Sequence, residues 1–241
     1  RRRESALERL NLYRALGGLP PVRLNSDGSK DAAAHARYLV LNGLIEHAED
    51  PRLPGYTPEG NAAGLGSNIS PGLGIDAIDI LYAVPYHRLL MVHPMLSEVG
   101  IGDDINLDTG FTALVLYFYR FDGSFPAKDS VVLSPAPFSQ GNGLAPLTGE
   151  RPAPLPDFGP SYGFPIMAQF FTTYGTPLHF DSRISVKGRD LPHQVISANR
   201  PSNPSFEQRL VALIPDDPLP KSADVSVSLS YLLYNEPKRL S

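Results

Sequence analysis

The sequence predicts an α+β protein in two parts, a mixed N-terminal half followed by an all-β C-terminal half. Apolar residues recur at helical spacing within the first 120 residues, and this spacing is lost beyond Asp122. The later part instead holds short β-like segments separated by turn residues. Proline and glycine, with 25 and 21 of 241 residues, exceed average usage, which argues against a helical bundle or a coiled coil.

The N-terminal half contains three predicted helices and two predicted strands. The first helix ends at Gly17-Gly18, and its apolar residues recur at helical spacing: Ala6, Leu7, Leu10, Tyr13 and Leu16. A polar cluster at 25–29 can cap a second helix that ends at Asn42-Gly43. Residues 49–74 are rich in proline and glycine and predict a long loop. Asp76 then begins a short helix through Tyr82 that Pro85 ends, and strands follow at 99–102 and 111–119.

The C-terminal half reads as short strands at 167–173, 183–186, 194–197, 209–213 and 225–234. In the last of these, apolar residues alternate with serines, which is the period of a half-buried strand. Short strands between turn signals predict an immunoglobulin-like β-sandwich. We therefore expect a first domain at 1–122, a linker at 123–130 and a sandwich at 131–241.

Composition excludes several classes of protein. Cysteine is absent, so a disulfide framework, a thiolate nucleophile and a cysteine-containing zinc site are excluded. The net charge of −4 and the lack of a concentrated basic face argue against a nucleic-acid partner. No apolar run approaches the length of a transmembrane segment, and no signal peptide is visible.

Two of the six histidines, His47 and His87, stand out as candidate ligands. His47 follows the second predicted helix, His87 follows the third, and Glu59 lies in the loop between them. Two imidazoles and one carboxylate at the ends of helices can converge on a divalent cation such as Zn²⁺. His35 lies within a helix, where a structural role is the simpler reading.

The first 120 residues resemble the CAP domain, the SCP-like extracellular module, in its bacterial cysteine-free form. The resemblance rests on motifs in a characteristic order: Leu10-Asn11-Leu12-Tyr13-Arg14, Gly18-Leu19-Pro20-Pro21-Val22, Ala32 to Tyr38, His47, then Tyr86-His87-Arg88-Leu89-Leu90, Pro94 and Glu98-Val99-Gly100-Ile101-Gly102. It implies an α-β-α sandwich in the first half. The segments 181–186, 213–220 and 223–231 likewise resemble the immunoglobulin-like module that follows some bacterial CAP domains.

The resemblance also implies a cleft with two histidines and two acidic residues, which in several members binds a divalent metal. His47 resembles the first histidine, His87 the second and Glu59 the loop glutamate. The second acidic residue has no counterpart, because Leu81-Tyr82-Ala83-Val84 occupies its place and Asp79 lies one turn earlier. If Glu59 is a metal ligand, no carboxylate remains as the base, which weakens the case for hydrolysis.

The leading interpretation is an exported bacterial protein with a non-catalytic binding role. The cleft of His47, Glu59 and His87 would bind Zn²⁺ or another divalent cation, a small apolar ligand or a cell-envelope component. One alternative is a metal-dependent hydrolase of peptide or envelope polymer, with Glu59 as the candidate base. Another is a structural or adhesion module whose cleft is vestigial.

Overall fold

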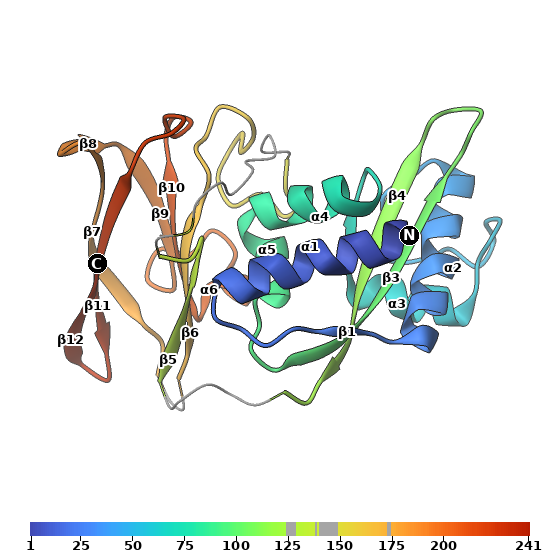
Figure 1. Cartoon of the computed structure of the whole chain (residues 1–241), viewed down its shortest axis with the longest axis horizontal. Helices are drawn as coiled ribbons and strands as arrows, with labels where there is room; N and C mark the ends of the chain where they lie inside the picture. The colour runs from blue at the N-terminus through green and yellow to red at the C-terminus, as the bar shows by residue number, and fades with distance from the viewer. Residues whose placement is uncertain (124–128, 138, 140–148, 173–174) are drawn as a thin grey trace. The chain divides into compact units, whose positions relative to one another are not determined.

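A computed structural model describes residues 1–123, 129–137, 139, 149–172 and 175–241 (Figure 1). The chain divides into two compact units by its internal contacts. Unit 1 comprises Arg1–Tyr82 and Leu90–Ser124, and unit 2 comprises Ala83–Leu89 and Phe125–Ser241. Residues 83–89 thus group with the C-terminal unit, although the sequence placed them in the first domain. Most of the expected linker, residues 124–128, lies outside the described residues.

The first two helices form where the sequence predicts them. Helix α1 spans Arg2–Leu16, and helix α2 spans Ser26–Asn42. The Asn25 side chain caps α2 by accepting hydrogen bonds from the backbone N–H groups of Asp27 and Gly28. Gly43 ends α2 in the left-handed conformation, with φ of 62°, which glycine adopts at little cost.

The predicted loop at 49–74 was wrong in its second half. It contains helix α3 (Pro58–Leu65) and strand β2 (Ser67–Ser70). Thr57 caps α3, because its hydroxyl accepts a hydrogen bond from Gly60 N, and Pro58 occupies the first turn, where no N–H donor is needed. Helix α4 spans Gly74–Ala83, and Pro85 begins a further helix, α5 (Pro85–Met91), rather than simply ending α4.

A four-stranded sheet lies between two helical layers in unit 1 (Figure 1). Its order is β1-β3-β4-β2, with β1 at Arg23–Leu24, β3 at Leu96–Ile105 and β4 at Thr112–Phe121. Strand β1 pairs with β3 in parallel, and the other pairs are antiparallel. Helices α2 and α3 cover one face and α1 and α4 the other, which confirms the expected α-β-α sandwich.

Helix α2 lies directly on β3 because glycines remove the side chains between them. A Cβ atom on Gly100 would lie 2.1 Å from the carbonyl oxygen of Gly28, and one on Gly102 would lie 2.2 Å from the nitrogen of Ala33. The same face of the helix packs on Ala113 and Val115 of β4 in one buried cluster. The glycines of the Val-Gly-Ile-Gly motif therefore allow the backbone of α2 to pack directly on β3.

A buried arginine joins α1 to the segment that leads into β3. The Arg14 side chain is fully buried, and it donates hydrogen bonds to the carbonyl oxygens of Pro20, Met91, His93 and Leu96 at 2.9–3.2 Å. Burial lowers the pKa of Arg14 to about 10, which still leaves the guanidinium charged at neutral pH. One side chain thereby satisfies four main-chain acceptors.

Unit 2 contains two four-stranded antiparallel sheets. One has the order β5-β6-β10-β9 and the other β12-β11-β7-β8. Their bounds are Ser130–Ser134 (β5), Ile166–Phe171 (β6), Leu178–Val186 (β7), Arg189–Leu191 (β8), His193–Ser197 (β9), Leu210–Pro215 (β10), Val225–Leu233 (β11) and Glu236–Leu240 (β12). A short helix, α6 (Pro204–Glu207), precedes β10.

The two sheets of unit 2 share one apolar core. Phe170 and Leu213 of the first sheet lie in the same buried cluster as Ile184 and Leu229 of the second. The rings of Phe170 and Tyr231 meet edge to face at 4.8 Å between centroids. A β-sandwich is therefore confirmed for the C-terminal half, and its immunoglobulin-like character stays a prediction.

We predict that Gly100→Ala destabilises the protein by about 1–3 kcal/mol, because the added methyl group collides with the backbone of α2. Thermal unfolding of the full chain followed by circular dichroism measures this as a lower Tm. Gly17→Ala is the control, since its Cβ would meet its nearest neighbour at 3.5 Å and φ there is −81°. Equal Tm values for the two variants would contradict the close packing.

Candidate functional site

His47 lies beyond the end of α2, and its side chain is exposed. Its Nδ1 atom lies 2.9 Å from the carbonyl oxygen of Gly64 in α3. A carbonyl oxygen can only accept a hydrogen bond, so Nδ1 is the donor. The neutral ring then carries its lone pair on Nε2. This is the orientation that a metal-ligating or hydrogen-bond-accepting histidine needs.

A buried pair of side chains, His35 and Glu49, holds the loop that carries His47. Both side chains are completely buried, and Nδ1 of His35 lies 2.8 Å from Oε1 of Glu49. The other ring nitrogen lies 3.0 Å from the carbonyl oxygen of Glu46. The second carboxylate oxygen accepts a hydrogen bond from Thr57 N at 2.9 Å. The loop from 46 to 57 is therefore fixed to α2 at both ends, in line with the structural role expected of His35.

Helix α3 packs closely on α2 through two glycines one turn apart. A Cβ atom on Gly64 would lie 2.4 Å from Cε1 of His35 and 2.4 Å from the carbonyl oxygen of His47. A Cβ atom on Gly60 would lie 2.6 Å from Oε1 of Glu49. Because these two positions of α3 carry no side chain, the helix contacts both the His35–Glu49 pair and the loop of His47.

Glu59 is exposed in the first turn of α3, in the same unit as His47. Its charge acts on Asp31 of α2. Partial burial, followed by the negative charges of Glu59 and Asp27, raises the pKa of Asp31. The negative charge of Glu59 therefore reaches α2, where Lys30 partly opposes its effect on Asp31.

His87, the third predicted ligand, belongs to unit 2. Its Nδ1 atom lies 2.8 Å from Oε1 of Glu150, and its backbone nitrogen donates to the same oxygen at 2.8 Å. The Glu150 side chain is completely buried, whereas that of His87 is 17% exposed. The sequence analysis missed Glu150, because 63 residues separate it from His87 and the Pro-rich stretch around it gave no chemical signal.

The residues on either side of His87 are also anchored within unit 2. The Tyr86 hydroxyl donates to the buried carboxylate of Glu207, and burial together with this carboxylate raises the pKa of Tyr86. Arg88 is fully buried and donates to the carbonyl oxygens of Ser134 and Pro165 at 3.0 and 2.8 Å. Tyr86, His87 and Arg88 thus each bond to a residue of the C-terminal half.

Asp79, the nearest carboxylate before His87 in the sequence, is engaged elsewhere in unit 1. It accepts a hydrogen bond from the Tyr13 hydroxyl at 2.7 Å and lies 3.4 Å from the Arg9 guanidinium. Burial is the main cause of its raised pKa. The stacked rings of Tyr13 and Tyr82, 3.7 Å apart, fix this arrangement between α1 and α4.

Comparison with known families agrees with the fold of unit 1. Residues 7–118 match the model of the CAP family, described as the cysteine-rich secretory protein family. These residues form a CAP domain. It is of the cysteine-free type, since the chain has no cysteine. A comparison with curated proteins gave no match. Among the described residues, no helix of the chain is long and apolar enough to cross a lipid bilayer.

A metal centre built from the three predicted ligands is not assembled within either unit. Although all three residues lie in the CAP domain, His47 and Glu59 belong to unit 1 and His87 belongs to unit 2. Within the part of the chain that the structure describes, no group of three or more His, Cys, Asp or Glu side chains is arranged to hold a metal ion. Unit 1 thus contains two of the three predicted ligands, whereas typical catalytic zinc sites have three protein ligands. Metal binding by these residues stays a prediction.

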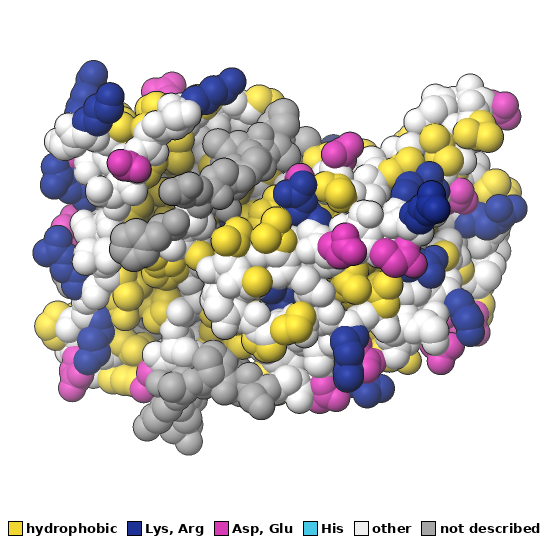
Figure 2. Space-filling view, viewed as in Figure 1, with side chains coloured by type: hydrophobic (Ala, Val, Ile, Leu, Met, Phe, Trp, Pro, Cys, Tyr) yellow, Lys and Arg dark blue, Asp and Glu magenta, His cyan; other side chains and the backbone are white. Residues whose placement is uncertain are grey.

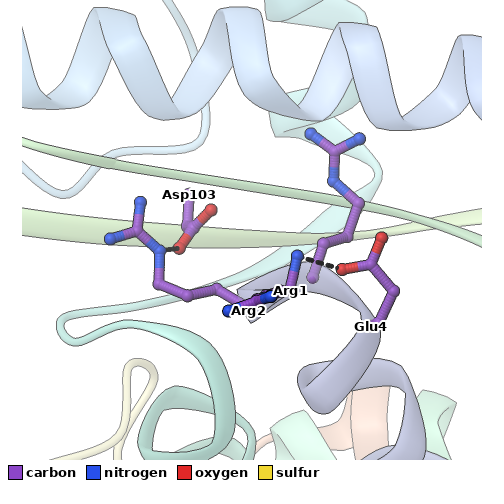
Figure 3. A pocket seen from close by; sticks show the side chains of 5 residues that line it. Arg1, Arg2, Glu4 and Asp103 are labelled. Atoms are coloured by element: carbon purple, nitrogen blue, oxygen red, sulfur yellow. Dashed lines mark ion pairs between the residues drawn. The ribbon is translucent and has the colours of Figure 1, made fainter.

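A polar hollow of about 330 Å³ lies at the start of the CAP domain and contains none of the predicted site residues. In Figure 3 the Arg2 side chain reaches Asp103, 2.8 Å away, and the Arg1 amino group reaches Glu4 at 2.5 Å. On the face seen in Figure 2, basic and acidic side chains are interspersed in the same way. Both acidic residues that line this hollow are therefore already in ion pairs, one with Arg2 and one with the amino terminus.

We predict that Glu49→Gln destabilises the CAP domain by about 1–3 kcal/mol. Nε2 of His35 donates to the Glu46 carbonyl, so Nδ1 donates to Glu49 when the ring is doubly protonated. The carboxylate then accepts from both His35 and Thr57, whereas an amide has one oxygen and would turn an N–H group toward a buried donor. Hydrogen exchange of the full chain should show faster exchange at 46–57 and a lower Tm.

Glu46→Gln is the matched control, because the Glu46 side chain is exposed and its contact with His35 uses the main-chain carbonyl. Unchanged exchange in Glu49→Gln would contradict the role of the buried pair.

Proposed function

We propose that the chain is an exported bacterial protein whose CAP domain binds a cell-envelope component or small apolar ligand without turning it over. His47 and Glu59 would be the polar side chains of the binding surface in unit 1. The description of the matching family as secretory supports export, and the absence of cysteine favours the bacterial branch of the resemblance.

The surroundings of His47 carry this proposal. The exposed imidazole of His47 is fixed by its hydrogen bond to Gly64. Large apolar side chains lie close to His47 and to Gly64 in the sequence. Ile45, two residues before His47, is 39% exposed, and Leu65, directly after Gly64, is 62% exposed. An oriented polar group flanked by exposed apolar side chains suits an amphipathic ligand.

The hydrogen bonds of the candidate residues favour binding over catalysis. In typical hydrolytic sites the general base is oriented by a further polar side chain. His47 is oriented by the hydrogen bond that its Nδ1 donates to a main-chain carbonyl, and Asp79 is committed to Tyr13 and Arg9. Glu59 is exposed to solvent rather than held in a dry site.

A divalent cation is the second candidate ligand. The Nε2 lone pair of His47 and the carboxylate of Glu59 are suitable donors. Two protein donors would leave most coordination positions to water or to the bound ligand, so the affinity would be low. Such a cation would act by attracting an anionic ligand, and no catalytic step is assigned to it.

Titration of the delipidated full chain with a fluorescent fatty-acid probe tests the binding proposal. We predict that Leu65→Ser weakens probe binding at least about fivefold, since burying such a side chain contributes about 1.5–3 kcal/mol. His47→Ala should weaken it as well, by removing the oriented polar group.

Leu107→Ser is the matched control, because Leu107 is 86% exposed in the turn between β3 and β4 of the same unit. Equal binding by all three variants would sink the apolar-ligand proposal. Zinc calorimetry on the wild type and His47→Ala tests the cation. Turnover of a peptide or envelope polymer that is lost in Glu59→Ala would favour the hydrolase instead.

A further inference from the structure

The contact between His87 and Glu150 has an unusual donor arrangement. Two nitrogen atoms of the same residue, the backbone N and the ring Nδ1, both lie 2.8 Å from one oxygen, Oε1 of Glu150. The other oxygen, Oε2, is buried and has no hydrogen-bond partner among the described residues. Within that part of the chain, the carboxyl group hydrogen-bonds through a single oxygen and to His87 alone.

This arrangement favours a proton on Nδ1 of the ring. A backbone N–H group can only donate, so Oε1 must accept from it. The same oxygen accepts from Nδ1 when the carboxyl group is ionised. It also accepts from Nδ1 when the group is protonated on Oε2, because Oε1 is then the carbonyl oxygen. In both of these states Nδ1 holds a proton, and in the neutral ring Nε2 holds the lone pair. The alternative is a proton on Oε1 itself, which would donate to Nδ1, and the spectra described below distinguish it.

The neighbouring residues prevent His87 from turning away from this contact. Tyr86 is bonded to Glu207 and Asn203, and Arg88 is bonded to Ser134 and Pro165. The Arg88 guanidinium also lies 4.3 Å from the ring centroid of Phe164. With the residues before and after it anchored, the His87 backbone is fixed relative to Glu150.

We propose that Glu150 is a positioning residue that sets the tautomer and orientation of His87, so that Nε2 meets its contacts as an electron-pair donor. The C-terminal half thereby supplies the acidic partner that the helix before His87 lacks. This inference goes beyond the proposed function, which concerns His47 and Glu59 of unit 1.

The tautomer can be measured directly on the ligand-free full chain. Long-range ¹H–¹⁵N correlation spectra of ¹⁵N-histidine-labelled protein distinguish a protonated Nδ1 from a protonated Nε2, and a His87→Gln spectrum assigns the resonances. We expect His87 of the wild type to carry its proton on Nδ1 at pH 7.5. A proton on Nε2 in the wild type would overturn the proposal.

Variants of Glu150 test the cause. Glu150→Ala should reduce the Nδ1-protonated form of His87 to a minority, whereas Glu150→Gln should keep it, since the amide oxygen can accept both hydrogen bonds. Glu150→Leu removes the acceptor while filling the buried volume, and it replaces Glu150→Ala if that variant does not fold.

Glu236→Ala is the control, an exposed carboxylate of the same unit paired with Lys238 at 2.7 Å. Retention of the Nδ1 proton in folded Glu150→Ala or Glu150→Leu would show that Glu150 does not position His87. Because the readout needs no ligand, failure of the binding proposal would leave this result intact.

Discussion

The buried guanidinium of Arg14 is the interaction on which unit 1 depends. Burying a charge without a carboxylate partner is costly unless its donors are satisfied, and here four main-chain carbonyl oxygens accept them. These carbonyls belong to the turn after α1 and to the stretch from the end of α5 to the start of β3. Arg88 acts similarly in unit 2, where it donates to the carbonyls of Ser134, at the end of β5, and Pro165. Each arginine therefore joins the ends of separate elements through main-chain carbonyls.

A series of contacts links Arg14 to the exposed His47. Arg14 donates a hydrogen bond to the carbonyl of Leu96, the first residue of β3. The glycines of β3 in turn pack against the backbone of α2. Helix α2 carries His35, whose bond to Glu49 fixes the loop that contains His47. The last contact comes from Gly64 of α3, which orients the imidazole. The position of the exposed His47 side chain therefore depends on close backbone packing at glycines as much as on the apolar core.

The sequence predicted the parts of the fold that depend on local chemistry. Asn25 and Gly43 mark the ends of α2 because capping is a property of a few adjacent residues. Helix α3 was missed although Thr57 and Pro58 form a recognisable start, because its glycines resemble those of a loop and serve instead for close packing on α2. The partner of His87 could not be predicted, since Glu150 is distant in the sequence and lies in a segment without helical or strand periodicity.

The grouping of residues 83–89 with unit 2 changes how the CAP motif is understood. The family match covers Tyr86, His87 and Arg88, yet each of these three side chains hydrogen-bonds to a residue of the C-terminal half. Tyr86 and Glu207 are both buried, and Arg88 is fully enclosed, so leaving any of them unpaired would carry the penalty of a buried polar group. The C-terminal half is therefore better understood as part of the chemical environment of His87 than as a module attached after the CAP domain.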